Sequence, residues 1–246
     1  MSVNEKMTAI ADAIRDKTGG TEKLGLDAMA SGVGEVYEKG KQAEYEQFWE
    51  HVYWGLDRYT FAGSAWNEYT FRPNKQITIS TGNPQYAFAQ HNYRGEPYDL
   101  AAQFEKYGGN LDCSAAVGVH YMFYQAKITR VPALNLSSCT TLSNTFNGCS
   151  SLVTIDGLTL SPTAAFTNTF AGCTSLANIT IDGEIGKNIS FEDSPLLTTE
   201  SVQSIIDHLK DLTGATAQPL TLHADVKANL TEEQLATITG KNWSVA

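Results

Sequence analysis

Two stretches of the chain carry the same order of apolar and polar residues. Residues 144–155 and 168–179 both begin Asn-Thr-Phe, continue with Gly-Cys, and end in Ser-Leu and a final Ile. The positions of their cysteines, Cys149 and Cys173, define the repeat offset, 173 − 149 = 24. A unit of this length cannot bury its apolar face alone, so the repetition predicts units that stack on their neighbours.

The apolar residues of each unit are expected to point inward and to stack on the same residues of the next unit. A fainter copy begins at Phe123, which precedes Phe146 by nearly the same offset, 146 − 123 = 23. Gly148 and Gly172 are expected to supply a turn that a Cβ would obstruct. The predicted repeat core is Phe123, Phe146, Cys149, Leu152, Ile155, Phe170, Cys173, Leu176 and Ile179.

The repeat offset also predicts the fold class. About 20–29 residues is the period of leucine-rich repeats, so we expect a strand-rich α/β solenoid over residues 56–195. Strand-like residues 158–160, 179–181 and 189–191 should form successive rungs of one parallel sheet. The paired Asn144/Asn168 and Thr145/Thr169 are interpreted mainly as ladders that satisfy turn backbone groups, with ligand contact as the alternative.

Residues 1–55 show three apolar stripes at helical spacing. Short helices with so much apolar surface need a partner, either the first repeat or copies of themselves. We therefore predict an N-terminal helical segment for attachment or oligomerisation. Its candidate contact residues are Ile10, Ile14, Leu26, Met29, Val33, Val36, Phe48 and Trp49.

The two ends of the predicted solenoid differ in regularity. Residues 56–119 carry the repeat only in degraded form, with a helix expected over 100–107 before Gly108. Residues 196–246 are predicted to be an α/β cap, because an open last repeat would expose its core and its strand edge.

The cap has its own helix and strand signals. An apolar helical face follows the N-cap candidates Thr198 and Thr199, 220–222 reads as a strand, and Thr231 begins a capping box. The helical face consists of Val202, Ile205, Ile206, Leu209 and Leu212. Leu235 and Ile238 carry the last helix, after which Trp243 and Val245 should cover the edge.

Charge and hydropathy exclude some partners. The formal net charge of −10, without a Lys/Arg cluster, argues against nucleic acid and anionic membrane. No apolar run reaches about 18 residues, so membrane insertion is not expected. The polar start of the chain lacks the apolar core of a signal peptide, which leads us to expect synthesis in a cytoplasm without processing.

The cysteines and histidines predict neither a metal site nor a cofactor. Cys113, Cys139, Cys149 and Cys173 form no C-x-x-C pair and have no histidine at ligand spacing. Buried structural thiols are the expectation. A disulfide between the cysteines of adjacent repeats is geometrically possible but disfavoured in a cytoplasm.

No common catalytic signature occurs in the chain, and no catalytic residue is predicted. The enzyme alternative is a carbohydrate-active site with His91, Glu96 or Asp99 as acid or base. A solvated loop is the favoured interpretation of those three residues, and a core or turn position is favoured for His120.

Aromatic residues gather in the degraded region. Rings offer large contact area at low entropic cost, and glycans and proteins are often bound this way. Most of these rings are assigned to the core, but some remain candidates for binding at the surface: Trp66, Tyr86, His91, Tyr93 and Tyr98.

The Phe-x-Gly-Cys-x-Ser-Leu-x-x-Ile units resemble the BspA-type leucine-rich repeats of bacterial surface proteins and of phages of gut bacteria. Residues 10–19 and 24–29 resemble the N-terminal segment of tail- or fibre-associated proteins of phages and prophages of Gram-positive bacteria. Residues 230–234 and 241–246 are similar to the C-terminal cap of the same group.

The resemblance implies a virion protein of a tail tip, baseplate or fibre. Such a protein would bind other virion proteins through its N-terminal segment, form a homo-oligomer, and turn its repeats toward a glycan or protein of the host surface. The alternatives are a cell-surface adhesin of the bacterium itself and, less favoured, the carbohydrate-active enzyme.

Overall fold

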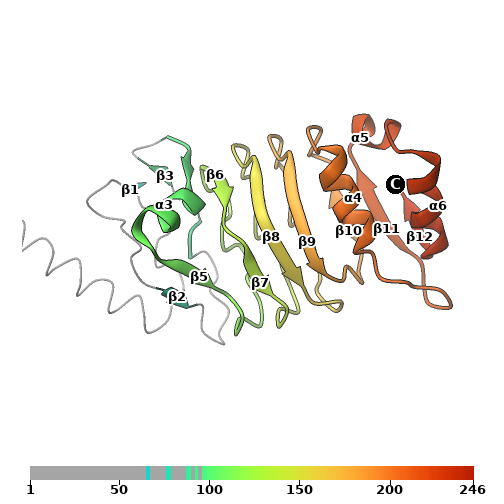
Figure 1. Ribbon diagram of the computed structural model, residues 1–246, viewed down its shortest axis with the longest axis horizontal. Helices are drawn as coiled ribbons and strands as arrows, with labels where there is room; N and C mark the ends of the chain where they lie inside the picture. The colour runs from blue at the N-terminus through green and yellow to red at the C-terminus, as the bar shows by residue number, and fades with distance from the viewer. Residues whose placement is uncertain (1–64, 67–75, 79–86, 90–91, 94–95) are drawn as a thin grey trace, which may run out of the picture. The chain divides into compact units, whose positions relative to one another are not determined.

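The computed structural model describes residues 65–66, 76–78, 87–89, 92–93 and 96–246. The chain divides into units of residues 1–51 and 52–246, and every described residue belongs to the second unit. The described part of that unit is an α/β structure in which the paired strands run parallel (Figure 1).

The largest sheet joins strands of successive repeats. The pairs Arg130↔Thr154, Leu134↔Leu158 and Ile155↔Ile179 all have the same offset as Cys149 and Cys173. The repeat seen in the sequence therefore sets the register of these pairs, and the register shifts by one residue at Leu158↔Ile181. Its strands are β4 (Tyr98–Asp99), β6 (Ile128–Val131), β7 (Leu134–Leu136), β8 (Thr154–Leu160) and β9 (Asn178–Gly183).

Two short sheets and a helix precede the regular repeats. Strands β1 (Ala65–Trp66) and β3 (Asn92–Tyr93) pair with each other, as do β2 (Gln76–Thr78) and β5 (Asn110–Asp112). Helix α3 (Leu100–Tyr107) ends at Gly108 in a left-handed conformation, as the sequence predicts.

The core of the repeats is a column of phenylalanine rings. Ring centroids are 5.3 Å apart between Phe123 and Phe146 and 5.7 Å apart between Phe146 and Phe170, with nearly parallel planes. Phe88 and Phe191 extend the column at its two ends, at 5.1 Å and 4.6 Å. All five rings are buried, so the column is continuous through the repeats and into the cap.

One of the strands predicted for the first sheet lies in a different sheet. Strand β10 (Ile189–Phe191) does not join β9 but forms a second sheet with β11 (Gln218–Leu222) and β12 (Trp243–Val245). The prediction that residues 189–191 continue the first sheet is therefore wrong. The reason is that the free edge of β9 is already occupied by helix α4 (Thr199–Asp207).

Serine hydroxyls of α4 replace the missing strand beside β9. The N–H of Ile179 donates to Ser201 Oγ and the N–H of Ile181 donates to Ser204 Oγ, both at 2.9 Å. Ser201 Oγ in turn donates to the carbonyl of Ala177 at 2.9 Å. An unpaired strand edge invites association with other chains, and these hydroxyls close it.

The remaining elements complete the cap. Helix α6 (Glu232–Gly240) begins with the predicted capping box, in which Thr231 and Gln234 exchange side-chain-to-backbone hydrogen bonds. Helix α5 (Ala224–Ala228) links β11 to α6. The predicted helical face of residues 202–212 is buried, and in α6 Ile238 is buried whereas Leu235 is exposed.

Candidate functional site

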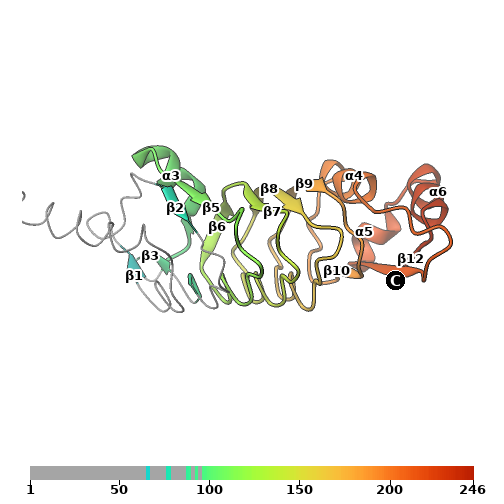
Figure 2. The same cartoon turned by 90° about the horizontal axis from the view of Figure 1, so that it is seen from below.

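Each repeat contains a turn segment opposite its strand. Three of these turn segments lie side by side: residues 118–126, 141–149 and 165–173. Figure 2 shows them on the lower side of the view, away from β8 and β9. Backbone hydrogen bonds join each to the next, for example Phe123 N to Thr145 O at 2.9 Å and Phe146 N to Thr169 O at 3.0 Å. The turn segments are thereby held in fixed register.

Hydroxyl and thiol groups satisfy the inner carbonyls of these segments. Thr145 Oγ1 donates to Val119 O at 2.9 Å and to Leu142 O at 2.7 Å, and Thr169 Oγ1 donates to the same Leu142 O at 2.9 Å. This is the ladder role expected of the two threonines. Both are buried, so their side chains face the interior and not a ligand.

The four cysteines are free and buried. Cys149 and Cys173 donate to the carbonyls of Phe123 and Phe146, at 2.9 Å and 3.2 Å. Burial raises the pKa of Cys139 to about 11 and that of Cys173 to about 12. Thiols with pKa values this high carry almost no thiolate at neutral pH and are poor nucleophiles. The other members of the predicted repeat core, from Phe123 to Ile179, are also buried.

Each turn segment contains two residues in the left-handed backbone region. At the first position Asn144 and Asn168 have φ of 57° and 52°, and at the second Gly148 and Gly172 have φ of 76° and 71°. Asn and Gly are the residues that tolerate this conformation best. The paired asparagines therefore fit their backbone conformation, and the Asn147 amide also donates to Asn144 Oδ1 at 2.9 Å.

The first turn segment breaks that rule at both positions. Tyr121 has φ of 55° and Gln125 has φ of 54°, where the next two segments have Asn and Gly. Tyr121 and Tyr124 form an edge-to-face ring pair with centroids 5.4 Å apart, and Gln125 Nε2 donates to Tyr124 Oη at 3.0 Å. Both tyrosines are half-buried and Gln125 is exposed.

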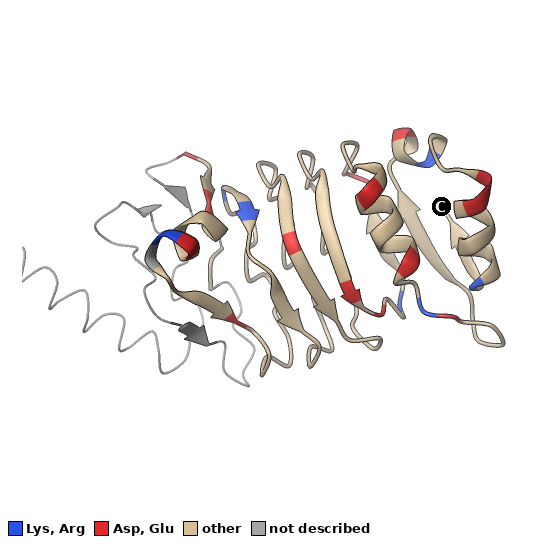
Figure 3. Ribbon diagram, viewed as in Figure 1, with Lys and Arg blue, Asp and Glu red and all other residues tan. Residues whose placement is uncertain are grey.

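The surface of the repeats is almost free of charge. Between residues 131 and 181 the chain has one charged side chain, Asp156. Figure 3 shows acidic and basic residues on α3 and on the helices of the cap, with the strands and loops between them mostly uncharged. The turn segments present Ser, Thr, Asn and Tyr side chains, which are uncharged hydrogen-bonding groups.

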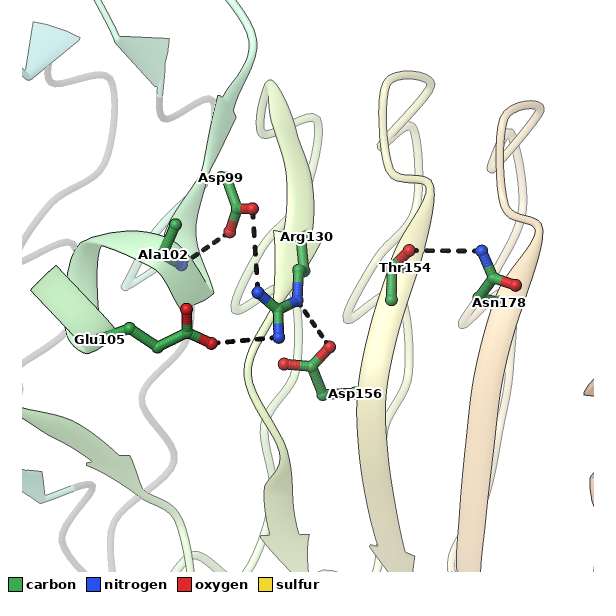
Figure 4. A network of polar contacts seen from close by, with 7 residues as sticks. All are labelled: Asp99, Ala102, Glu105, Arg130, Thr154, Asp156 and Asn178. Atoms are coloured by element: carbon green, nitrogen blue, oxygen red, sulfur yellow. Dashed lines mark hydrogen bonds and ion pairs between the residues drawn. The ribbon is translucent and has the colours of Figure 1, made fainter.

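Three charged side chains of the sheet, Asp99, Arg130 and Asp156, form one network with Glu105 of α3. Arg130 Nε donates to Asp156 Oδ1 at 2.7 Å, and its other nitrogens lie 3.1 Å from Glu105 and 4.0 Å from Asp99 (Figure 4). The hydrogen bond that Arg130 donates to Asp156 is the main cause that raises the pKa of Arg130 above its usual range. This network ties α3 to β6 and β8.

The residues of the enzyme alternative have different surroundings. Asp99 caps α3 by accepting from Ala102 N at 2.7 Å, in addition to its ion pair with Arg130. Glu96 is exposed, and His91 lies outside the described residues. His120 is half-buried in a turn segment, where burial lowers its pKa.

The structure describes three of the five candidates for surface binding. Trp66 and Tyr93 are register partners in β1 and β3, and Tyr86 lies outside the described residues together with His91. Tyr98 is wrong as a surface candidate, because it is 6% exposed. It pairs in register with the buried Ile128, and burial raises its pKa well above the usual value.

The sequence prediction missed the tyrosine pair of the first turn segment. Aligning residues 118–126 with residues 141–149, at the offset that joins Phe123 to Phe146, would have placed Tyr121 opposite Asn144 and Gln125 opposite Gly148. The candidates of the N-terminal segment, from Ile10 to Trp49, all lie outside the described residues.

Comparisons of the chain with family models, curated proteins and solved structures return no match. In the described part of the chain, no group of three or more His, Cys, Asp and Glu side chains is arranged to hold a metal ion. None of the helices described here is long and apolar enough to cross a bilayer.

Proposed function

We propose that this chain is a structural protein of a phage virion, part of a tail tip, baseplate or fibre. In this proposal residues 56–195 are a BspA-like leucine-rich-repeat solenoid and residues 196–246 are its cap. The repeat offset, present both in the sequence and in the strand register, supports the repeat assignment. The resemblances of residues 10–19 and 230–246 support the virion assignment.

The repeat domain binds a glycan or a protein on the host surface, and the N-terminal segment binds other virion proteins and further copies of the chain. The observation that carries this proposal is the row of turn segments, which the phenylalanine column holds in fixed register. A preordered surface loses little entropy on binding. Several copies on one particle raise a modest affinity through effective concentration.

Electron microscopy of particles labelled with an antibody to this chain tests the proposal. Label at the tail end of the particles is the expected result. Label on washed cells that carry no particles would overturn the proposal in favour of the bacterial adhesin.

Truncation tests the role of the N-terminal segment. A chain that lacks residues 1–44 should fold through its repeats but should be missing from purified particles. The matched control is Leu196→Asn, which changes an exposed side chain outside the segment and should be incorporated normally. Equal incorporation of the truncated chain and the control would refute the attachment role.

A further inference from the structure

The first turn segment differs from the second at Tyr121, Tyr124 and Gln125, which lie outside the column of buried phenylalanine rings. Phe123 keeps the place of Phe146 and Phe170 in the buried column, so the core accounts for the ring at that position. Tyr121 and Tyr124 lie outside this column, are half-buried and replace asparagines of the second segment.

Backbone strain points to a selected function for the same residues. Tyr121 and Gln125 occupy left-handed conformations that favour Asn and Gly, and the two neighbouring segments have Asn and Gly there. Residues that keep an unfavourable backbone conformation cluster at functional sites. The strained pair also flanks Tyr124, whose hydroxyl accepts the hydrogen bond from Gln125, so the strain and the ring pair belong to one feature.

The surroundings of the tyrosine pair select the chemistry of a ligand. Residues 118–126, 141–149 and 165–173 contain no Asp, Glu, Lys or Arg. An anionic polymer would find no Lys or Arg on them, whereas sugar hydroxyls can bond to amide and hydroxyl groups. Next to the tyrosines lie Ser143, Asn144 and Asn147, because Tyr121 N bonds to Ser143 O and Gln125 N bonds to Asn147 O.

Together these observations point to one class of ligand. We infer that Tyr121 and Tyr124 form an aromatic platform, held by Gln125, that stacks on a sugar ring of a neutral polysaccharide. The polysaccharide chain continues across the amides and hydroxyls of the next two turn segments. These recur at the strand spacing of about 4.8 Å, which is similar to the length of one pyranose ring. The inference names the ligand class of the host-binding surface and rests on the proposed function.

The decisive variant carries Tyr121→Asn, Tyr124→Asn and Gln125→Gly, which give the first segment the residues of the second. Removing the two strained side chains should leave the protein folded with an unchanged or higher Tm, so loss of binding cannot come from unfolding. The matched control is Leu196→Asn, which removes an exposed apolar side chain far along the sequence.

Binding is measured by affinity electrophoresis of the full chain in gels that contain laminarin, galactomannan, dextran or xylan, with polygalacturonate as the anionic comparison. We expect retardation by at least one neutral polysaccharide that persists at high salt, is unchanged in the control, and is at least ten-fold weaker in the triple variant. Absence of retardation by all four, preference for polygalacturonate, or equal binding by the triple variant would each overturn the inference.

The outcome is separable from that of the proposed function. The triple variant should still enter particles, because its substitutions lie outside the N-terminal segment. If the chain binds a polysaccharide but antibody labelling finds it only on cells, the aromatic platform is supported and the virion assignment is refuted. If antibody labels the particles but the chain binds no polysaccharide, the virion assignment is supported and the aromatic platform is refuted.

Discussion

Removal of one hydroxyl tests how the last repeat is closed. Ser201 is 3% exposed, and its Oγ accepts from Ile179 N and donates to Ala177 O, each at 2.9 Å. Ser201→Ala leaves the N–H of Ile179 without an acceptor in a position where the strand is buried. A buried group that loses its partner costs about 1–3 kcal/mol, and we expect a loss of about 2 kcal/mol in the free energy of unfolding.

The expected loss can be measured in two ways. In urea denaturation followed by circular dichroism, the midpoint should fall while the m-value stays constant. The Tm should fall by about 4–8 °C, at about 2–4 °C per kcal/mol for a domain of this size. Hydrogen exchange should also accelerate in the peptide that contains Ile179, because its amide is no longer bonded.

Two further serines calibrate this result. Ser204→Ala removes the acceptor of Ile181 N at a half-buried position, where water replaces part of the bond, so a smaller loss of about 1 kcal/mol is expected. Ser190→Ala, at an exposed position, should change stability by less than about 0.5 kcal/mol. Equal midpoints for Ser201→Ala and Ser190→Ala would refute the assignment of Ser201 as the group that closes the sheet edge.

Three other predictions follow from the turns and the thiols. Gly172→Ala should destabilise the protein by about 2 kcal/mol in urea denaturation, since φ is 71° and the new Cβ would lie 3.3 Å from Gly148 Cα. Gly214→Ala, at φ of 80° with open space, should cost only about 1 kcal/mol, and equal losses would contradict the predicted crowding. The four thiols should resist Ellman's reagent at mildly alkaline pH and all react in denaturant, whereas rapid reaction of the native protein would contradict their burial. Hydrogen bonds from Ser114 lower the pKa of Asp112, so the stability that Asp112 contributes should be full at neutral pH and be lost below about pH 4, as the difference between wild type and Asp112→Ala in urea denaturation will show.

The parts of the fold that repeat were predictable from the sequence. The likeness of residues 144–155 to residues 168–179 identified the buried phenylalanines, and the same offset appears in the pairing of β8 with β9. The capping box at Thr231 and the left-handed end of α3 at Gly108 were predictable because each depends on residues close together in the chain.

The parts that the sequence left open depend on contacts between distant residues. The serines of α4 have the spacing of ordinary helical polar residues, and no periodicity shows that Ser201 and Ser204 bond to a strand of the preceding repeat. Residues 189–191 were correctly predicted to be a strand. Their pairing partner was not predictable, because it depends on α4 covering the edge of β9. Tyr98 was misassigned because its register with Ile128, which makes it a core residue, is a property of the sheet.

The candidate site was only partly predictable from the sequence. Its lack of charge can be read from residues 131–181 directly. The strain at Tyr121 and Gln125 is a backbone property, and it becomes visible only when the dihedral angles of equivalent positions are compared.

Because the hydroxyls of α4 close the edge of β9, the number of repeats can change without a change in the contacts at the end of the sheet. Gly172 N donates to Asp193 Oδ2 at 2.8 Å in the place where Gly148 N meets the carbonyl of Ala171, so a carboxylate replaces the backbone carbonyl that a further repeat would supply. Duplication of one repeat between β8 and β9 would leave both termini with their present neighbours. Gene duplication or unequal recombination could thus lengthen the molecule one block at a time while every intermediate remained a complete, folded protein.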